Sequence, residues 1–160
     1  MNFLTPALAV KSLNEINLKK YWETGKRGII LDLDNTITPW NEMELSQDAR
    51  SFLAEALGLK YKVFLLSNAK RKRTEMIAHK YAISYLAPAL KPRKTAFLKA
   101  LALMGLKGEQ VLVIGDQIFT DILGGNRVGC YTILVPPISP REFIGTKFFR
   151  LLETLFRRSR

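Results

Sequence analysis

The stretch RGIILDLDNT, residues 27–36, decides how the whole chain is interpreted. A continuous apolar run leads directly into two aspartates, Asp32 and Asp34, which are separated by one residue. Continuous apolar runs, rather than runs that alternate with polar residues, are typical of strands buried on both faces of a parallel sheet. The stretch therefore predicts a central strand that delivers two carboxylates to the edge of a sheet.

Three further apolar runs have the same form, and one weaker run brings the expected number of strands to five. These runs cover residues 61–68, 82–87, 111–116 and 130–136. Apolar residues at helical spacing fill segments between the strands, at residues 46–60, 71–82 and 93–105. Strands that alternate with helices predict an α/β fold. We expect three α/β/α layers of the Rossmann-like type, built around a mainly parallel five-stranded sheet.

Polar residues follow most of these strands. In open α/β sheets, ligands bind at the carboxyl ends of the strands. This rule gathers six side chains in one cleft: Asp32, Asp34, Ser67, Asn68, Lys91 and Asp116. Clustered carboxylates repel one another, and Mg²⁺, which prefers oxygen ligands and phosphate-bearing substrates, offsets the repulsion. The sequence therefore predicts Mg²⁺ as the cofactor, with Asp32 and Asp116 as its side-chain ligands.

The residue types in this cleft also predict a reaction. Asp32 can attack phosphorus as a nucleophile and form an aspartyl-phosphate, while Asp34 can protonate the leaving alcohol and later activate water. Ser67 can donate a hydrogen bond to the phosphoryl group, and Lys91 can balance the negative charge. Asn68, beside Ser67, is a further candidate for substrate binding. Taken singly, these residues have plainer interpretations, because Ser67 and Asn68 can cap a helix and Lys91 can be a solvated lysine.

Four short motifs occur in the order and spacing of the motifs of haloacid-dehalogenase-like (HAD) phosphatases, which the chain resembles between residues 28 and 136. They are DLDNT (32–36), LLSN (65–68), LKP (90–92) and GDQIFTD (115–121). The resemblance implies that Asp32 is the nucleophile and that Asp34 is the general acid/base. It also implies a HAD fold and a phosphatase activity for this chain.

The same resemblance assigns the remaining roles. It implies that Ser67 and Lys91 bind the phosphate and that Asp116 is a metal ligand. The backbone carbonyl of Asp34 is expected to complete the protein's share of the metal shell. Asp121 matches the last acidic position of the fourth motif and is expected to support that shell. A carboxylate on a helix surface is the alternative interpretation of Asp121.

Two longer stretches narrow the resemblance. LDLDNTITPW (31–40) and GDQIFTDILGGNRVG (115–129) look like the YqeG-like branch of the HAD phosphatases, which is related to mitochondrial and plastid phosphatidylglycerophosphate phosphatases. This similarity covers nearly the whole chain, so we expect one domain over residues 1–160. It also makes phosphatidylglycerophosphate, which would be converted to phosphatidylglycerol, the leading candidate substrate.

The spacing of the motifs bears on the size of the substrate. Only 34 residues lie between Asp32 and Ser67, and 23 lie between Ser67 and Lys91. One helix and one strand fill most of each interval, which leaves no room for a large cap domain. An uncapped cleft suits a substrate that is too large to be enclosed, such as a lipid head group at a membrane or the end of a macromolecule.

The net charge of +11 at pH 7 predicts an anionic partner. Basic residues cluster at residues 70–73, 91–94 and 156–160. The segment 141–160 also carries apolar residues at helical spacing, which predicts an amphipathic helix that lies on an anionic membrane or packs on the sheet. We therefore expect an anionic phospholipid and a peripheral membrane surface as partners, and no obligate protein partner is evident.

Two other functions stay open. A nucleotide or nucleic-acid-end phosphatase would also use the basic clusters, although no aromatic-interleaved basic motif favours nucleic acid. A non-catalytic basic scaffold would bind a membrane or nucleic acid, although a scaffold has no use for a nucleophile.

The chain is expected to work in the cytoplasm, at the inner face of the membrane. One cysteine, Cys130, excludes an intramolecular disulfide and favours a reducing compartment. No apolar run approaches the roughly 18 residues that span a bilayer. The apolar start has no basic segment ahead of it, so no cleaved signal peptide is expected.

Overall fold

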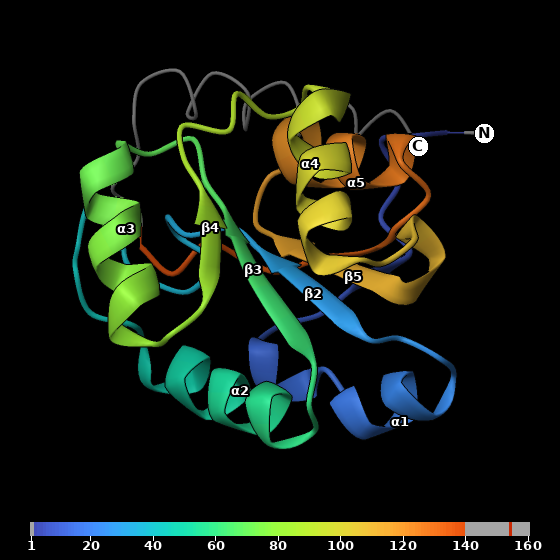
Figure 1. The fold of residues 1–160 in the computed structure, drawn as a ribbon, viewed down its shortest axis with the longest axis horizontal. Coiled ribbons are helices and arrows are strands. Elements are labelled where there is room, and N and C mark those ends of the chain that lie inside the picture. The colour runs from blue at the N-terminus through green and yellow to red at the C-terminus, as the bar shows by residue number, and fades with distance from the viewer. Residues whose placement is uncertain (1, 140–153, 155–160) are drawn as a thin grey trace.

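The computed structural model describes residues 2–139 and residue 154. Within that part of the chain, six parallel strands form one sheet in the order β1-β6-β5-β2-β3-β4 (Figure 1). The strands are β1 (Leu8–Ala9), β2 (Gly28–Leu31), β3 (Lys62–Leu66), β4 (Ser84–Leu86), β5 (Val111–Gly115) and β6 (Tyr131–Leu134).

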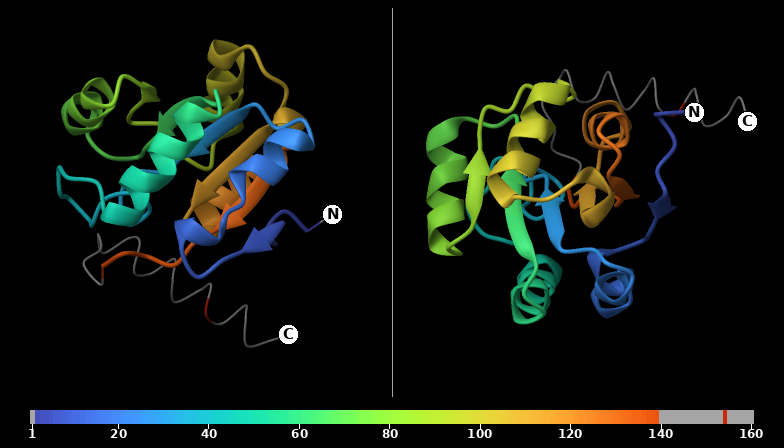
Figure 2. Two further views of the ribbon diagram at one scale, coloured as in Figure 1. Left: turned by 90° about the horizontal axis from the view of Figure 1, so that it is seen from below. Right: turned by 45° about the vertical axis from the view of Figure 1, so that its right-hand side comes forward.

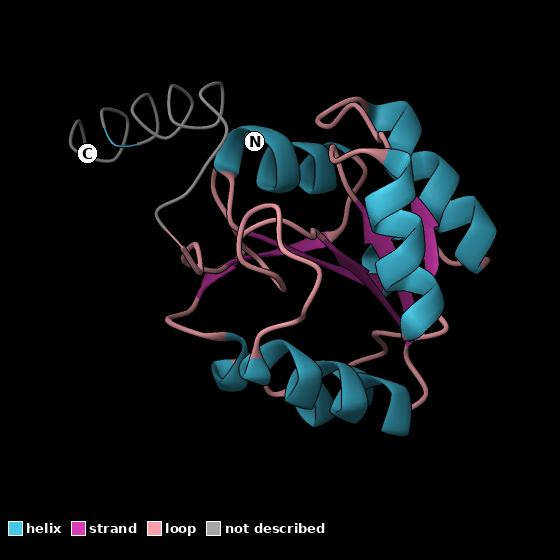
Figure 3. Ribbon diagram, turned by 90° about the vertical axis from the view of Figure 1, so that its left-hand side faces the viewer, coloured by secondary structure: helices cyan, strands magenta, loops and turns pink. Residues whose placement is uncertain are grey.

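Helices connect the strands and cover both faces of the sheet. The α-helices are α1 (Leu18–Glu23), α2 (Gln47–Gly58), α3 (Arg71–Lys80), α4 (Lys94–Met104) and α5 (Leu123–Arg127). Three short helical turns complete the described chain: η1 (Leu13–Glu15), η2 (Gly108–Gln110) and the π-helical η3 (Ile118–Ile122). Figure 3 shows helices on both sides of the magenta sheet, so the expected three-layer α/β fold is confirmed.

The sequence missed one strand. Five strands form where the apolar runs predict them, and β1 adds a sixth at the edge of the sheet, beside β6. Leu8 pairs with Ile133 and Ala9 with Leu134. A strand of two residues is too short to show a periodic pattern, so only its partner in the folded sheet reveals it.

The two faces of the sheet have separate cores. Helices α1 and α2 lie below the sheet in Figure 1, whereas α4 and α5 lie above it, and Figure 2 shows the same separation from another side. Helix α3 lies beside the edge strand β4. Its Ile77 and Ala78 join the core between α2 and the sheet. Phe97 and Ala100 of α4 pack with Phe64 in the opposite core.

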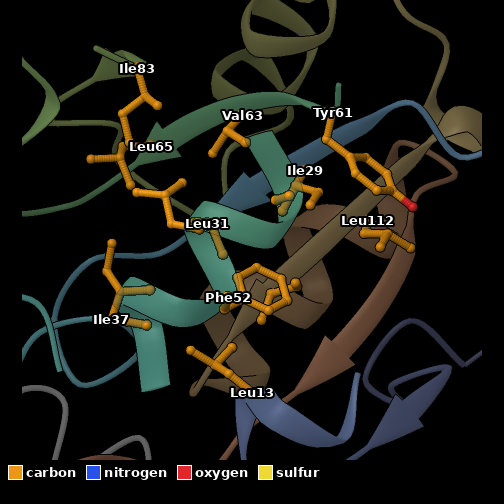
Figure 4. Packing of buried hydrophobic residues seen from close by; sticks show 14 of the residues in the cluster. Leu13, Ile29, Leu31, Ile37, Phe52, Tyr61, Val63, Leu65, Ile83 and Leu112 are labelled. Atoms are coloured by element: carbon orange, nitrogen blue, oxygen red, sulfur yellow. The ribbon is translucent and has the colours of Figure 1, made fainter. Parts of the chain in front are cut away.

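The alternation of side chains along β2 explains why its sequence is apolar throughout. Ile29 and Leu31 point into the core between the sheet and α2, where they pack with Phe52 (Figure 4). Ile30, between them, belongs to the core under α4. A strand that is buried on both faces has no solvent side on which polar residues would be favoured.

The sheet brings several strand ends to one edge. Leu31 of β2 is paired with Leu65 of β3 on one side and with Ile114 of β5 on the other. Because all three strands run in the same direction, the residues that follow them emerge side by side. The segments that follow β2, β3 and β5 therefore form the part of the molecule that carries the predicted site.

Two further expectations bear on membranes. No helix in the described part of the chain combines the length and the apolar character that a membrane crossing requires. The predicted amphipathic segment 141–160 lies, apart from residue 154, outside the described residues.

Candidate active site

The residues that the sequence singles out follow neighbouring strands at one edge of the sheet. Asp32 and Asp34 come after β2, Ser67 and Asn68 after β3, Lys91 after β4, and Asp116 after β5, and Asp121 lies in η3. Three of these carboxylates converge, because Asp32, Asp116 and Asp121 each offer an oxygen within 4.8 Å of the others. All three are buried.

A buried lysine joins two of the carboxylates. The Nζ atom of Lys91 lies 2.7 Å from Oδ1 of Asp32 and 2.6 Å from Oδ1 of Asp121. Burial by itself would lower the pKa of Lys91, but the carboxylates of Asp121 and Asp32 outweigh it and raise the pKa above its ordinary value. The two carboxylates therefore stabilise the charged form of Lys91 inside the cluster.

Asp121 is held by the side chain of Lys91 and by the backbone N–H of Gln117. Burial raises the pKa of Asp121 to about 6, the ammonium of Lys91 opposes the rise, and the charge of Asp32 adds to it. The backbone N–H of Gln117 donates to Oδ2 of Asp121 at 3.2 Å. The π-helical turn η3 carries this side chain back toward the strand end, and such turns are frequent at functional sites.

Gly115 gives Asp121 the room to reach the cluster. A Cβ atom built at Gly115 would lie 2.2 Å from Oδ2 of Asp121 and 2.3 Å from its Cγ. Any larger residue at this position would displace the carboxylate. The glycine that ends β5 is thus part of the site, although it carries no functional group.

Thr36 is a member of the site that sequence reasoning did not single out. Its hydroxyl lies 3.1 Å from Oδ2 of Asp32 and 3.2 Å from Oδ1 of Asp116, and its one hydrogen can serve either carboxylate. The signal was present, because Thr36 closes the DLDNT motif. However, the presence of a threonine after two aspartates does not by itself predict that its hydroxyl contacts the carboxylates.

The side chain of Asp34 lies apart from the carboxylate cluster. Its Oδ1 accepts a hydrogen bond from the backbone N–H of Asn41 at 3.0 Å and pairs with Nη2 of Arg73 at 2.8 Å. The predicted contact of the Asp34 carbonyl with a metal stays a prediction.

Asn68 and Ser67 hold different parts of the site. The amide of Asn68 accepts from the backbone N–H of Lys91 at 2.8 Å and donates to its carbonyl at 3.3 Å, so it fixes the position of Lys91. Asn68 thus positions Lys91, and its predicted contact with the substrate through the second amide hydrogen stays a prediction. Ser67 Oγ accepts from the N–H of Ala69 at 3.0 Å, which leaves the hydroxyl hydrogen available to donate.

The donor set fits a hard divalent cation. Three buried carboxylates face one ammonium group, so the cluster keeps an excess of negative charge. All the candidate ligand atoms are oxygens, which Mg²⁺ prefers. No thiol is a candidate ligand, because the chain's one cysteine, Cys130, precedes β6 at its amino end, whereas the site follows the carboxyl ends of the strands.

Comparison with known proteins shows which ones this chain resembles in sequence. A family model described as HAD-hydrolase-like matches residues 89–137. The chain is 36% identical over 151 residues to "Probable phosphatase YqeG" of Bacillus subtilis (strain 168), covering 94% of this chain and 88% of that protein. It is 25% identical over 167 residues to "Phosphatidylglycerophosphate phosphatase 1, chloroplastic/mitochondrial" of Arabidopsis thaliana, covering 98% of this chain and 48% of that protein. This chain therefore spans about half the length of the Arabidopsis relative.

A solved structure shows the same fold. The cobalt-bound deoxy-D-mannose-octulosonate 8-phosphate phosphatase of Haemophilus influenzae matches with a TM-score of 0.54 and 16% sequence identity, over 69% of this chain and 68% of that chain. The identity to YqeG along nearly the whole chain, together with the family match, shows the family to which this chain belongs. The chain belongs to the HAD-like phosphatases, in the branch that contains YqeG.

Proposed function

We propose that this phosphatase requires Mg²⁺, works through an aspartyl-phosphate on Asp32, and converts phosphatidylglycerophosphate to phosphatidylglycerol. The observation that carries the catalytic part is the buried cluster in which Lys91 contacts Asp32 and Asp121 beside Asp116. Asp32 and Asp116 would hold the ion with the carbonyl of Asp34, and Asp121 would support them. The bound ion would offset the repulsion between these carboxylates and the phosphate.

The chain's own groups divide the reaction into two steps. In the first, a carboxylate oxygen of Asp32 forms a bond to phosphorus while the ester bond breaks, and Asp34 gives a proton to the leaving oxygen. In the second, Asp34 takes a proton from water, the water oxygen attacks phosphorus, and the bond to Asp32 breaks. Ser67 and Lys91 hold the transferring group throughout, through a hydroxyl donor and a fixed positive charge.

Support for a lipid substrate comes from the relatives and from the open site. The Arabidopsis relative carries the name of a phosphatidylglycerophosphate phosphatase. Between Asp32 and Ser67 the described chain forms one long helix, α2, and one strand, and between Ser67 and Lys91 it forms α3 and β4. Neither interval contains a cap domain, so a head group that stays attached to a membrane can reach the carboxylates.

The residues around the site favour binding to a membrane surface that is anionic and partly apolar. Leu90 is 53% exposed and immediately precedes Lys91. Ile138 is 40% exposed, and its N–H bonds to the carbonyl of Asn35. The exposed Lys70 and other basic residues at the start of α3 follow Ser67 and Asn68 in the chain. Exposed apolar side chains together with basic ones are the composition that binds at an anionic lipid interface.

The covalent intermediate is the first expected outcome. Brief reaction with 4-nitrophenyl phosphate and Mg²⁺, followed by an acid quench, should leave a phosphoryl group on the peptide that contains Asp32, detectable by mass spectrometry. EDTA should abolish both turnover and the adduct, and added Mg²⁺ should restore them. Asp32→Asn should form no adduct, because the amide is not nucleophilic. Near-normal turnover by folded Asp32→Asn would contradict the mechanism.

The second expected outcome concerns Gly115. Gly115→Ala should lower kcat/KM by about 100-fold, the loss that a displacement of about 1 Å can cause, because the new methyl group pushes Asp121 away from Lys91. Gly58→Ala is the matched control, since a Cβ at Gly58 meets no atom within 4 Å. Steady-state kinetics and thermal unfolding measure both variants. If folded Gly115→Ala is as active as Gly58→Ala, the position of Asp121 does not matter for catalysis and its assignment to the site is wrong.

The third expected outcome separates a lipid substrate from the alternatives. Phosphatidylglycerophosphate in anionic vesicles should be a far better substrate than a 5′-phosphorylated oligonucleotide, and raised salt should weaken vesicle binding. Leu90→Asn should lower kcat/KM on vesicles several-fold and spare 4-nitrophenyl phosphate. Leu103→Asn, on a side chain 64% exposed at the far end of α4, should change neither rate. A preference for the oligonucleotide would overturn the lipid assignment.

A further inference from the structure

Arg73 connects helix α3 to the loop that follows β2. Its Nη2 atom lies 2.8 Å from Oδ1 of Asp34 and 3.2 Å from the hydroxyl of Thr38. Nη2 and Nε also donate to the carbonyl of Glu42, at 2.5 and 3.0 Å. The Arg73 side chain is 13% exposed. One guanidinium group therefore ties together three points of the loop over residues 34–42.

These contacts engage only one oxygen of Asp34. Oδ1 forms the ion pair with Arg73 and accepts the backbone N–H of Asn41, whereas Oδ2 has no hydrogen-bond partner among residues 2–139. The loop around Asp34 is itself tight, because the N–H of Asn35 donates to the carbonyl of Thr38 at 2.7 Å. The Asp34 carboxyl group is thus anchored at one oxygen and open at the other.

We infer that Arg73 is a positioning residue for Asp34, which it holds so that Oδ2 carries the proton exchanged with the leaving group and with water. The inference rests on the proposed role of Asp34 as general acid/base. It goes further, because it assigns a function to one residue of a basic run that otherwise reads as a charged surface.

The chemistry needs this division between the two oxygens. When the ester bond breaks, the O–H bond at Oδ2 breaks and the proton passes to the leaving oxygen; in the second step Oδ2 regains a proton from water. Throughout, Oδ1 can accept the backbone N–H of Asn41 and stay beside the guanidinium of Arg73, whether the carboxyl group is neutral or charged. Anchoring through Oδ1 therefore fixes the geometry without blocking the proton, and a misplacement of about 1 Å can cost about 100-fold in rate.

The rest of the basic run does not share this role. Arg71 and Lys72 are exposed, and neither forms an ion pair within the described part of the chain. Arg50 of α2 offers a useful contrast, because its Nη1 donates to the carbonyl of Leu45 at 3.1 Å. Arg50 thus holds the neighbouring part of the loop without contacting Asp34.

The test compares two esters of similar size. 4-Nitrophenolate departs readily without a proton, whereas the alkoxide of benzyl phosphate needs one. Arg73→Met should lower kcat/KM about 10- to 100-fold on benzyl phosphate and less than about 3-fold on 4-nitrophenyl phosphate. kcat/KM is the right quantity, because it reports the transfer to Asp32 and not the later hydrolysis. Arg50→Met should lower the two rates equally or not at all.

Asp34→Asn separates failure of this inference from failure of the proposed function. If Asp34→Asn shows no greater loss on benzyl phosphate than on 4-nitrophenyl phosphate, the general acid role of Asp34 is wrong. If Asp34→Asn shows that difference and Arg73→Met loses both activities equally, Arg73 is only structural and the inference is overturned. Arg73→Gln, which keeps a polar side chain on the helix, gives the same comparison if the Met variant unfolds.

The double variant provides a second readout. If Arg73 acts through Asp34, adding Arg73→Met to Asp34→Asn should change kcat/KM on benzyl phosphate by less than about 3-fold, because the two changes remove the same step. A further 10-fold loss in the double variant would show that Arg73 acts elsewhere and would overturn the inference.

Discussion

A single buried ammonium group makes the carboxylate cluster possible. Lys91 lies within 2.7 Å of Asp32 and 2.6 Å of Asp121, and all three side chains are almost fully removed from solvent. Charges buried without a partner are strongly unfavourable, and breaking a buried ion pair by removing one member typically costs about 3–5 kcal/mol. The fold meets this demand with a lysine whose backbone is held on both sides by the amide of Asn68.

The strand order explains why these groups meet. β2 lies between β5 and β3, and the N–H of Asp32 extends the pairing by donating to the carbonyl of Ile114 at 3.0 Å. Asp32 and Asp116 therefore leave neighbouring strands at nearly the same level, close enough for Thr36 to contact both. β4 then brings Lys91 to the same edge, beyond β3. The site follows from the parallel topology, and the helices below and above the sheet serve to bury the strands that carry it.

Sequence reasoning recovered the parts of the molecule that repeat a simple physical pattern. The continuous apolar runs predicted β2, β3 and β5, and the rule for strand ends predicted that Asp32 and Asp116 would meet. The pattern could not predict contacts that depend on the folded backbone. Arg73 stands in a basic run and Asp34 in an acidic motif, and nothing in either stretch predicts that the two residues pair. A run of basic residues ordinarily indicates a solvated surface.

The same distinction applies to small residues. Gly115 and Thr36 stood inside quoted motifs, yet their roles depend on the close approach of Asp121 and on a hydroxyl placed between two carboxylates. Neither distance follows from residue type. The two-residue strand β1 was missed for a related reason, because its only evidence is its pairing with β6.

The claim that Lys91 holds the cluster together is tested most directly by unfolding Lys91→Met and Lys91→Met/Asp121→Asn in urea, with EDTA present. The single variant leaves the carboxylates of Asp32, Asp116 and Asp121 without their cation, so it should lose about 3–5 kcal/mol of unfolding free energy. Removing the Asp121 charge should then restore about 1–3 kcal/mol in this background, although Asp121→Asn alone should not stabilise the wild-type protein. If Asp121→Asn has the same effect with and without Lys91, the two groups are not coupled and the account is wrong.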